Sequence, residues 1–176
     1  AGSLGRFVET VTPQRVAAIA RMDDRPADAA AAAAGPLALV LVGVSDPGNA
    51  GTLLRSAEGA GAGAVLFCDG SVDPFGPKCV RSSAGSLFRL AVVREAPAVD
   101  ALAALAAAGA RTVATEARAP EPYDAVDLTG PVVLCVGGEE EGLRHLTQER
   151  CDRLIGLPMQ GHVSSLSHGT NEPSCA

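Results

Sequence analysis

Apolar runs of strand length alternate with segments of helical composition along most of this chain, and this alternation constrains the fold most strongly. The first run, "LALVLVGV", covers residues 37–44. The later runs are residues 64–69, 88–93, 111–116, 131–137 and 153–159, and the expected helices are 49–61, 77–83, 98–108 and 141–150. The pattern is typical of an α/β fold with a mostly parallel sheet flanked by helices. Because ligands of such sheets bind beyond the carboxyl ends of the strands, we expect functional residues there.

The composition limits the size and contents of this fold. The chain has 176 residues, enough for one domain with a sizeable core, and it contains no Trp and one Tyr. The formal net charge of -6 argues against a protein that coats nucleic acid non-specifically, although it permits a local basic site. The five cysteines form no C-x-x-C pair, so we expect reduced thiols in or near the core and no metal site.

The N-terminal part of the chain is expected to precede the globular core. Thr12 can cap a short helix over residues 12–22. The alanine run 27–34 fits either a helix or a flexible linker, so we assign residues 1–35 to a leader or linker and residues 36–176 to one domain. No stretch approaches the ~18 consecutive apolar residues of a membrane span, and a signal-peptide pattern is lacking, so we expect a cytoplasmic protein.

The stretch "DPGNAGTLLRSAEGAG", residues 46–61, follows the first apolar run. Its glycines suggest a phosphate-binding loop, but it has neither a correctly placed G-x-G-x-x-G nor a G-x-x-x-x-G-K-[ST] motif. It offers instead Asn49 and, six residues later, Arg55, both near the start of an expected helix. Taken alone, the two residues also fit a helix-capping amide and a solvated arginine.

Two further segments follow strand-like runs. In "LCVGGEEEGLRH" a run breaks at Gly137 and Gly138 before three glutamates, which fits either close approach of a ligand to the backbone or capping of a helix N-terminus. In "LPMQGHVSSL" a run ends in paired serines that lack the G-x-S-x-G context of a serine nucleophile. The simple alternatives are an ordinary loop and, for His162, a surface residue rather than a metal ligand.

Taken in order and spacing, these three segments resemble the three motifs of the SpoU/TrmH family, which are RNA ribose 2'-O-methyltransferases of the SPOUT class. The stretch "VDPFGPKCVRSSAGSLFRLAVV" is similar to the family's link between motifs one and two. The resemblance covers residues 37–166 and implies a catalytic domain that uses S-adenosylmethionine, a C-terminal trefoil knot and a homodimer. It also implies that residues 1–35 hold at most a remnant of an N-terminal RNA-recognition domain.

The resemblance assigns roles to residues by position. The catalytic set is Asn49, Arg55, Glu139 and Ser165. The cofactor set is Thr115, Gly137, Gly138, Leu157, Met159 and Leu166, with Thr115 near the adenosine. The residues expected to contact RNA phosphates are Arg55, Lys78, Arg81, Arg144 and Arg150.

A ribose hydroxyl is a poor nucleophile, so a protein assists its methylation mainly by positioning it and by stabilising developing charge. Arg55 supplies a fixed positive fork for that oxygen or a neighbouring phosphate, and electrostatic positioning suits a guanidinium better than base catalysis does. We expect Asn49 to orient Arg55, and Glu139 to pair with Arg55 or to lie near the cationic cofactor.

The C-terminus departs from the family pattern. Ser167 stands where the family has asparagine, and "HGTNEPSCA" is too short and too interrupted by Gly and Pro for the family's closing helix. We therefore expect incomplete knot closure and weak cofactor binding. The alternative function is a catalytically impaired SPOUT-like domain that binds RNA or a partner. Ribosomal RNA is the expected substrate, from the likeness of residues 137–166 to bacterial ribosomal members, and transfer RNA is the alternative.

Overall fold

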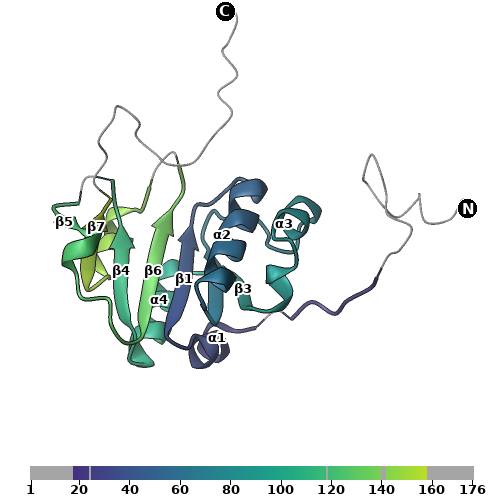
Figure 1. Cartoon of the computed structure of the whole chain (residues 1–176), viewed down its shortest axis with the longest axis horizontal. Coiled ribbons are helices and arrows are strands. Elements are labelled where there is room, and N and C mark those ends of the chain that lie inside the picture. Colours follow the sequence, from purple (N-terminus) through teal and green to yellow (C-terminus); the bar gives the residue numbers. More distant parts are fainter. Residues whose placement is uncertain (1–17, 24, 118, 140–141, 158–176) are drawn as a thin grey trace, which may run out of the picture.

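Seven strands form one sheet, and every paired neighbour runs parallel (Figure 1). The computed structural model describes residues 18–23, 25–117, 119–139 and 142–157. The strands are β1 (Leu37–Val42), β2 (Ala64–Cys68), β3 (Ala91–Ala96), β4 (Arg111–Thr115), β5 (Glu121–Pro122), β6 (Val132–Gly137) and β7 (Arg153–Gly156). The expected α/β fold with a mostly parallel sheet is confirmed.

Helices connect most of the strands. They are α1 (Ala27–Ala33), α2 (Pro47–Gly59), α3 (Pro77–Ser82), α4 (Ala98–Ala107) and α5 (His145–Glu149), with 3-10 turns η2 (Ser86–Phe88) and η3 (Tyr123–Ala125). The spatial order of the strands is β3-β2-β1-β6-β4-β7-β5. β1 therefore lies between its successor β2 and the much later β6. The connections leave β1 and β6 in opposite directions, which opens a crevice at their carboxyl ends.

Small apolar side chains fill the layers on both sides of β1, β2 and β3. One core cluster packs side chains of α1 and α4 against the sheet, and includes Val40, Leu66 and Leu102. The other packs α2 and α3 against the opposite face, and includes Leu41 and Leu54, each fully buried. Strands buried on both faces read as continuous apolar runs, which is why the sequence marks them clearly.

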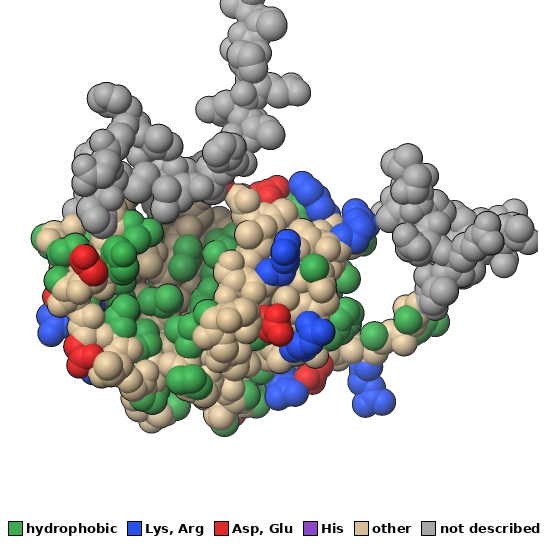
Figure 2. All heavy atoms as spheres, viewed as in Figure 1, with side chains coloured by type: hydrophobic (Ala, Val, Ile, Leu, Met, Phe, Trp, Pro, Cys, Tyr) green, Lys and Arg blue, Asp and Glu red, His purple; other side chains and the backbone are tan. Residues whose placement is uncertain are grey.

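The second half of the sheet is covered differently. Val113, Val132 and Ile155 form a small third cluster over β4, β6 and β7, and Leu134 packs against it while remaining half-buried. Among the described residues no helix lies over these strands on the α2 side (Figure 1), and Figure 2 shows hydrophobic side chains at the surface there. The described part of the chain thus covers one half of the sheet more completely than the other.

The alanine run forms helix α1, and Ala30 and Ala31 are buried in the core cluster, so the helix reading of this run is right and the flexible linker is wrong. The helix expected over residues 12–22 is absent from its described part, residues 18–22, and the rest lies outside the described residues. The domain boundary at residue 36 stays a prediction.

Three element boundaries also differ from expectation. The strand expected from residue 88 begins at residue 91, because the amides of Ser86, Phe88 and Arg89 are satisfied within the preceding turn. The link between β4 and β6, where the sequence pattern predicts no strand, contains β5, a two-residue edge strand in which a proline is tolerated. The last expected helix is shorter, since α5 begins at His145.

No described helix has the length and apolar character that a membrane crossing requires.

Candidate active site

The carboxyl ends of β1 and β6 meet at the centre of the sheet. Val42 pairs with Gly137, and the amide of Gly138 donates a 2.8 Å hydrogen bond to the carbonyl of Val42. A Cβ at Gly138 would overlap the carbonyl oxygen of Gly43, and one at Gly137 would overlap the backbone of Gly142. The two glycines are therefore required by the close approach of the loops after β1 and β6.

Helix α2 starts directly after β1 with a side-chain cap. The Oδ1 atom of Asp46 accepts a 2.8 Å hydrogen bond from the amide of Asn49, and Pro47 occupies the first turn. This backbone hydrogen bond, helped by the nearby Lys78 ammonium, lowers the pKa of Asp46. Lys78 Nζ lies 3.3 Å from Asp46 Oδ2, so α3 is also tied to this capping residue.

The side chain of Asn49 bridges the two loops. Its Nδ2 donates a hydrogen bond to Oε1 of Glu139, which is 90 residues later in the chain and just beyond β6. The expected contact of Asn49 with Arg55 is not found, and Glu139 pairs with Asn49 instead of Arg55. Helix geometry explains this, since side chains six residues apart on an α-helix point about 120° away from each other.

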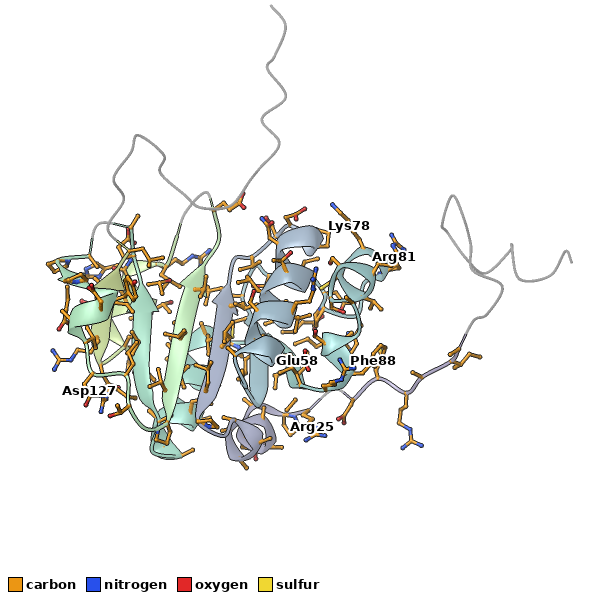
Figure 3. All side chains as sticks on the ribbon, in the orientation of Figure 1. Arg25, Glu58, Lys78, Arg81, Phe88 and Asp127 are labelled. Atoms are coloured by element: carbon orange, nitrogen blue, oxygen red, sulfur yellow. The ribbon has the colours of Figure 1, made fainter. Side chains whose placement is uncertain are left out.

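Arg55 lies on the outer side of α2. It is exposed and has no hydrogen bond or ion pair with any described residue. It lines an open hollow of about 530 Å³ between α2 and the turn that follows α3. Figure 3 shows Lys78 and Arg81 on α3, to one side of α2. A free guanidinium on this side is available to an anion from solution.

A second group of polar atoms lines the ends of β4, β6 and β7. Thr115 Oγ1 donates a 3.1 Å hydrogen bond to the carbonyl of Cys135 on β6. Gln148 Nε2 lies 3.2 Å from Glu116 Oε2 and donates a 2.9 Å bond to the carbonyl of Leu143. Gly138 and Gly142 form an isolated antiparallel bridge that closes the loop after β6. This edge presents backbone polar groups and carboxylates.

Comparison with known protein families identifies the family of proteins to which this chain is related. Residues 36–167 match the SpoU rRNA Methylase family. The chain belongs to this family. The match includes all three segments that the sequence singles out, and the first two now lie side by side in space.

Curated relatives agree with this SpoU assignment. The chain is 39% identical over 132 residues to the 23S rRNA (guanosine-2'-O-)-methyltransferase RlmB of Pseudomonas putida, covering 75% of this chain and 53% of that protein. It is 35% identical over 161 residues to the 23S rRNA (guanosine(2553)-2'-O)-methyltransferase RlmP of Bacillus subtilis, covering 90% and 62%. The SpoU chain thus spans little more than half the length of the curated relatives it matches.

Solved structures are similar as well. The SpoU methyltransferase AviRb from Streptomyces viridochromogenes in complex with AdoMet is 34% identical, with a TM-score of 0.68 over 76% of this chain and 52% of that one. The AdoMet-bound rRNA methyltransferase from Sinorhizobium meliloti is 32% identical, with a TM-score of 0.75 over 82% and 55%. The observed sheet is therefore that of SpoU methyltransferases.

The remaining predicted site residues of the SpoU chain are divided between described and undescribed parts. Leu157 directly follows β7 and is 48% exposed. Met159, Ser165 and Leu166 lie outside the described residues, as do the predicted knot closure and the altered tail from Ser167. The structure thus brings Asn49, Thr115 and the residues after β6 to one edge, while their predicted roles stay predictions.

The predicted RNA-contacting cations fall into two groups. Lys78 and Arg81 lie on α3, on the same side of the sheet as Arg55. Arg144 and Arg150 flank α5. The neighbouring Leu143 and Cys151 pack with the cluster of α1 and α4, so the second group belongs to the opposite layer. All five cationic side chains are exposed.

Thiol chemistry is disfavoured near this edge. Burial raises the pKa of Cys68, at the end of β2, to about 12, and that of Cys79 on α3 to about 11. A buried protonated thiol is a poor nucleophile. The described residues also contain no group of three or more His, Cys, Asp or Glu side chains that could hold a metal ion.

Several residues of the site are not evident from sequence reasoning. Asp46 carries a recognisable signal, because an aspartate before a proline at a helix start is a common cap. Glu116 and Gln148 carry none, since their contact depends on how α5 docks beside β4. The ion pair of Glu58 and Arg89, 3.8 Å apart beside the hollow, likewise depends on the turn after α3.

Proposed function

We propose that this chain contains the catalytic domain of an S-adenosylmethionine-dependent RNA methyltransferase that methylates a ribose 2'-hydroxyl. One observation carries the proposal: the Asn49 to Glu139 hydrogen bond joins two SpoU motifs at the crevice between β1 and β6. The names of the curated relatives, which are 23S rRNA 2'-O-methyltransferases, support the reaction.

The residues beside this crevice fit the cofactor chemically. S-adenosylmethionine, when bound, supplies a methyl group activated by a sulfonium cation. Glu116 and Glu139 would favour a cation at this edge, and the glycines after β6 leave backbone groups without covering side chains. We propose that Thr115, Gly137, Gly138, Leu157, Met159 and Leu166 hold it. The similar methyltransferases of Streptomyces viridochromogenes and Sinorhizobium meliloti, which are bound to AdoMet, support this choice of cofactor.

Arg55 is proposed to act on the RNA. Its guanidinium, free of partners among the described residues, would hold a phosphate or the reacting ribose oxygen by charge-assisted hydrogen bonds. Because guanidinium scarcely deprotonates in proteins, its contribution is position and electrostatics. Asn49 and Glu139 would fix the two loops relative to each other, and Ser165 is assigned to the catalytic set by its place in the third motif.

Ribosomal RNA is the proposed substrate, supported by the relatives named above. Transfer RNA is the second candidate substrate. A solved structure that is 28% identical to this chain, with a TM-score of 0.62, concerns 2-OH methylation of C/U34 on tRNA. Lys78, Arg81, Arg144 and Arg150 would contribute phosphate contacts. Since these cations are few in a chain of net charge -6, RNA affinity should be low and should fall as the salt concentration is raised.

The proposal also includes the oligomeric state of the protein and its location in the cell. We infer a homodimer and a C-terminal trefoil knot from the family resemblance, and a cytoplasmic location from the ribosomal substrate. Free Cys68, Cys79, Cys135 and Cys151 are in keeping with a reducing compartment. The second candidate function, an impaired SPOUT-like RNA- or partner-binding domain, is favoured only by Ser167, which stands where the family has asparagine.

The test is methyl transfer from labelled S-adenosylmethionine to ribosomal RNA and to transfer RNA, followed by nucleoside analysis. Label on a 2'-O-methylated nucleoside of ribosomal RNA is the expected result. Transfer RNA labelled instead would overturn the substrate and leave the reaction standing. Calorimetric titration of the chain with S-adenosylmethionine up to high micromolar concentration tests the second candidate. An impaired domain gives no heat of cofactor binding and transfers no methyl group, although it binds RNA.

A further inference from the structure

The hollow beside Arg55 is polar on nearly every side. Its lining comes from α2 and from the turn after α3, and consists of Thr52, Arg55, Ser56, Glu58, Ala84, Ser86 and Arg89. Its volume of about 530 Å³ is within the range of small-ligand sites. The hollow lies on the outer side of α2, whereas the Asn49 to Glu139 contact lies at the N-terminal end of that helix.

The charges of this hollow leave a net positive site. Glu58 Oε1 lies 3.8 Å from Arg89 Nη1, and Ser86 Oγ donates a 3.4 Å hydrogen bond to Glu58 Oε2. Glu58 therefore pairs with Arg89 and offsets one positive charge. Arg55 has no such partner among the described residues and supplies the remaining charge. The hollow is suited to an anion that two guanidinium groups can reach.

An exposed aromatic residue, Phe88, lies in the chain between two residues that line the hollow, Ser86 and Arg89. Phe88 is 67% exposed, although large apolar side chains are usually buried, and it directly precedes Arg89 at the end of η2. Figure 3 shows Phe88 on this turn, to one side of Glu58. Figure 2 shows Lys and Arg side chains gathered over the same half of this face. An aromatic ring within a basic surface is the arrangement with which proteins bind unpaired nucleotides.

We propose that the hollow and Phe88 form a subsite for an unpaired RNA nucleotide outside the reacting one. Arg89 holds a backbone phosphate at the hollow, next to the group that Arg55 holds, Glu58 pairs with Arg89, and the adjoining base stacks on Phe88. The proposal rests on the proposed function, because it deepens the RNA contacts of the same enzyme. It adds Phe88, Arg89 and Glu58 to the residues that recognise RNA.

The test is direct binding of a fluorescently labelled, unstructured RNA 10-mer to the full chain, followed by anisotropy at several salt concentrations. Phe88→Ala should weaken binding about tenfold. Phe88→Tyr, which keeps the stacking face, should bind within about twofold of the parent. Phe88→Leu, which keeps apolar bulk without the ring, should behave like Phe88→Ala. Arg89→Ala should lower the slope of log affinity against log salt by about 0.7.

Tyr123→Ala is the matched control, because Tyr123 is 47% exposed on η3, beyond β1 and β6 from the hollow. It should leave RNA binding unchanged. The subsite is overturned if Phe88→Ala or Arg89→Ala binds RNA like the parent, if Phe88→Leu binds like Phe88→Tyr, or if the parent binds no RNA. It is also overturned if Phe88→Ala shifts sedimentation, or lowers the melting temperature by more than about 4 °C, because Phe88 then packs against protein.

The two proposals fail separately. Loss of RNA affinity in Phe88→Ala, in a parent chain that transfers no methyl group, supports the subsite and contradicts the proposed function. Methyl transfer by the parent, with RNA affinity unchanged in both the Phe88→Ala and Arg89→Ala variants, contradicts the subsite and leaves the proposed function standing.

Discussion

The two halves of the sheet are built differently. Around β1, β2 and β3, helices of the described chain cover both faces, and the side chains of Leu54 and Phe67 are completely or almost completely buried. Around β4, β6 and β7, the described residues form a cluster of three buried side chains on one face, and Leu134 stays half-buried. Arg55, Lys78 and Arg81 of the proposed RNA contacts belong to the first half, and the proposed cofactor edge belongs to the second. Stability and cofactor binding should therefore respond to different substitutions.

The largest expected effect is a difference in how much one leucine side chain contributes to stability in each half of the sheet. Leu54→Ala removes a fully buried side chain from between α2 and the sheet and should lower the free energy of unfolding by about 2–5 kcal/mol. Leu134→Ala, the same change at a half-buried position, should cost about 1 kcal/mol. Urea unfolding of both variants measures the difference. Equal losses would mean that the second half is as well covered as the first.

The next effect concerns the loops after β1 and β6, where the two halves of the sheet meet. Gly138→Ala places a methyl group against the carbonyl of Gly43 and should destabilise the fold by about 1–3 kcal/mol. It should also weaken cofactor binding in a calorimetric titration, because the loop after β6 must move. Gly59→Ala is the control, since nothing lies within 4 Å of its Cβ position. A control that behaves like Gly138→Ala would remove the steric explanation.

Much of the fold was predictable because each buried strand is a continuous apolar run. The start of β3 was not, since Phe88 is apolar and yet belongs to an exposed turn. Strand β5 was missed because two residues, one of them a proline, carry no strand pattern. Each of these failures lies where local composition and tertiary position disagree.

The candidate site was predictable to a different extent. The rule that ligands bind at the carboxyl ends of parallel strands is enough to predict from the sequence that Asn49 and Glu139 lie in one region. Their direct hydrogen bond follows from the adjacency of β1 and β6, which the order of elements along the chain does not determine. The orientation of Arg55 away from Asn49 follows from helical geometry, and the hollow depends on the fold of the turn after α3.

A smaller effect tests the bridge between the halves. Asn49→Ala removes the hydrogen bond to Glu139 and should lower the free energy of unfolding by about 1 kcal/mol. Asn49→Asp is the sharper variant, because it places a second carboxylate beside Glu139 and should destabilise the fold more than alanine does. Thermal unfolding of the two variants ranks them. If Asn49→Ala destabilised the fold more than Asn49→Asp does, the Glu139 carboxylate would not be the partner that holds the Asn49 side chain.

The smallest effect lies within the second half. The backbone amide and then the hydroxyl of Thr112, each 2.8 Å from Oδ2, lower the pKa of Asp152. A lowered pKa contributes stability that is present above the unfolded value of about 3.9 and is lost as pH falls through the folded value. The stability difference between the parent and Asp152→Asn should thus stay constant above pH ~5 and shrink below pH ~4. A difference that grows on acidification would contradict this.

The division between an RNA side and a cofactor edge is tested most directly by single-turnover methyl transfer in Arg55→Ala over a series of cofactor concentrations. At saturating cofactor the rate should fall about 100- to 1000-fold, the loss typical of one preorganised charge-stabilising donor. The cofactor concentration that gives half the maximal rate should stay within about twofold of the parent, because Arg55 lies apart from the strand ends. A parental rate, or a tenfold rise in that concentration, would contradict the account.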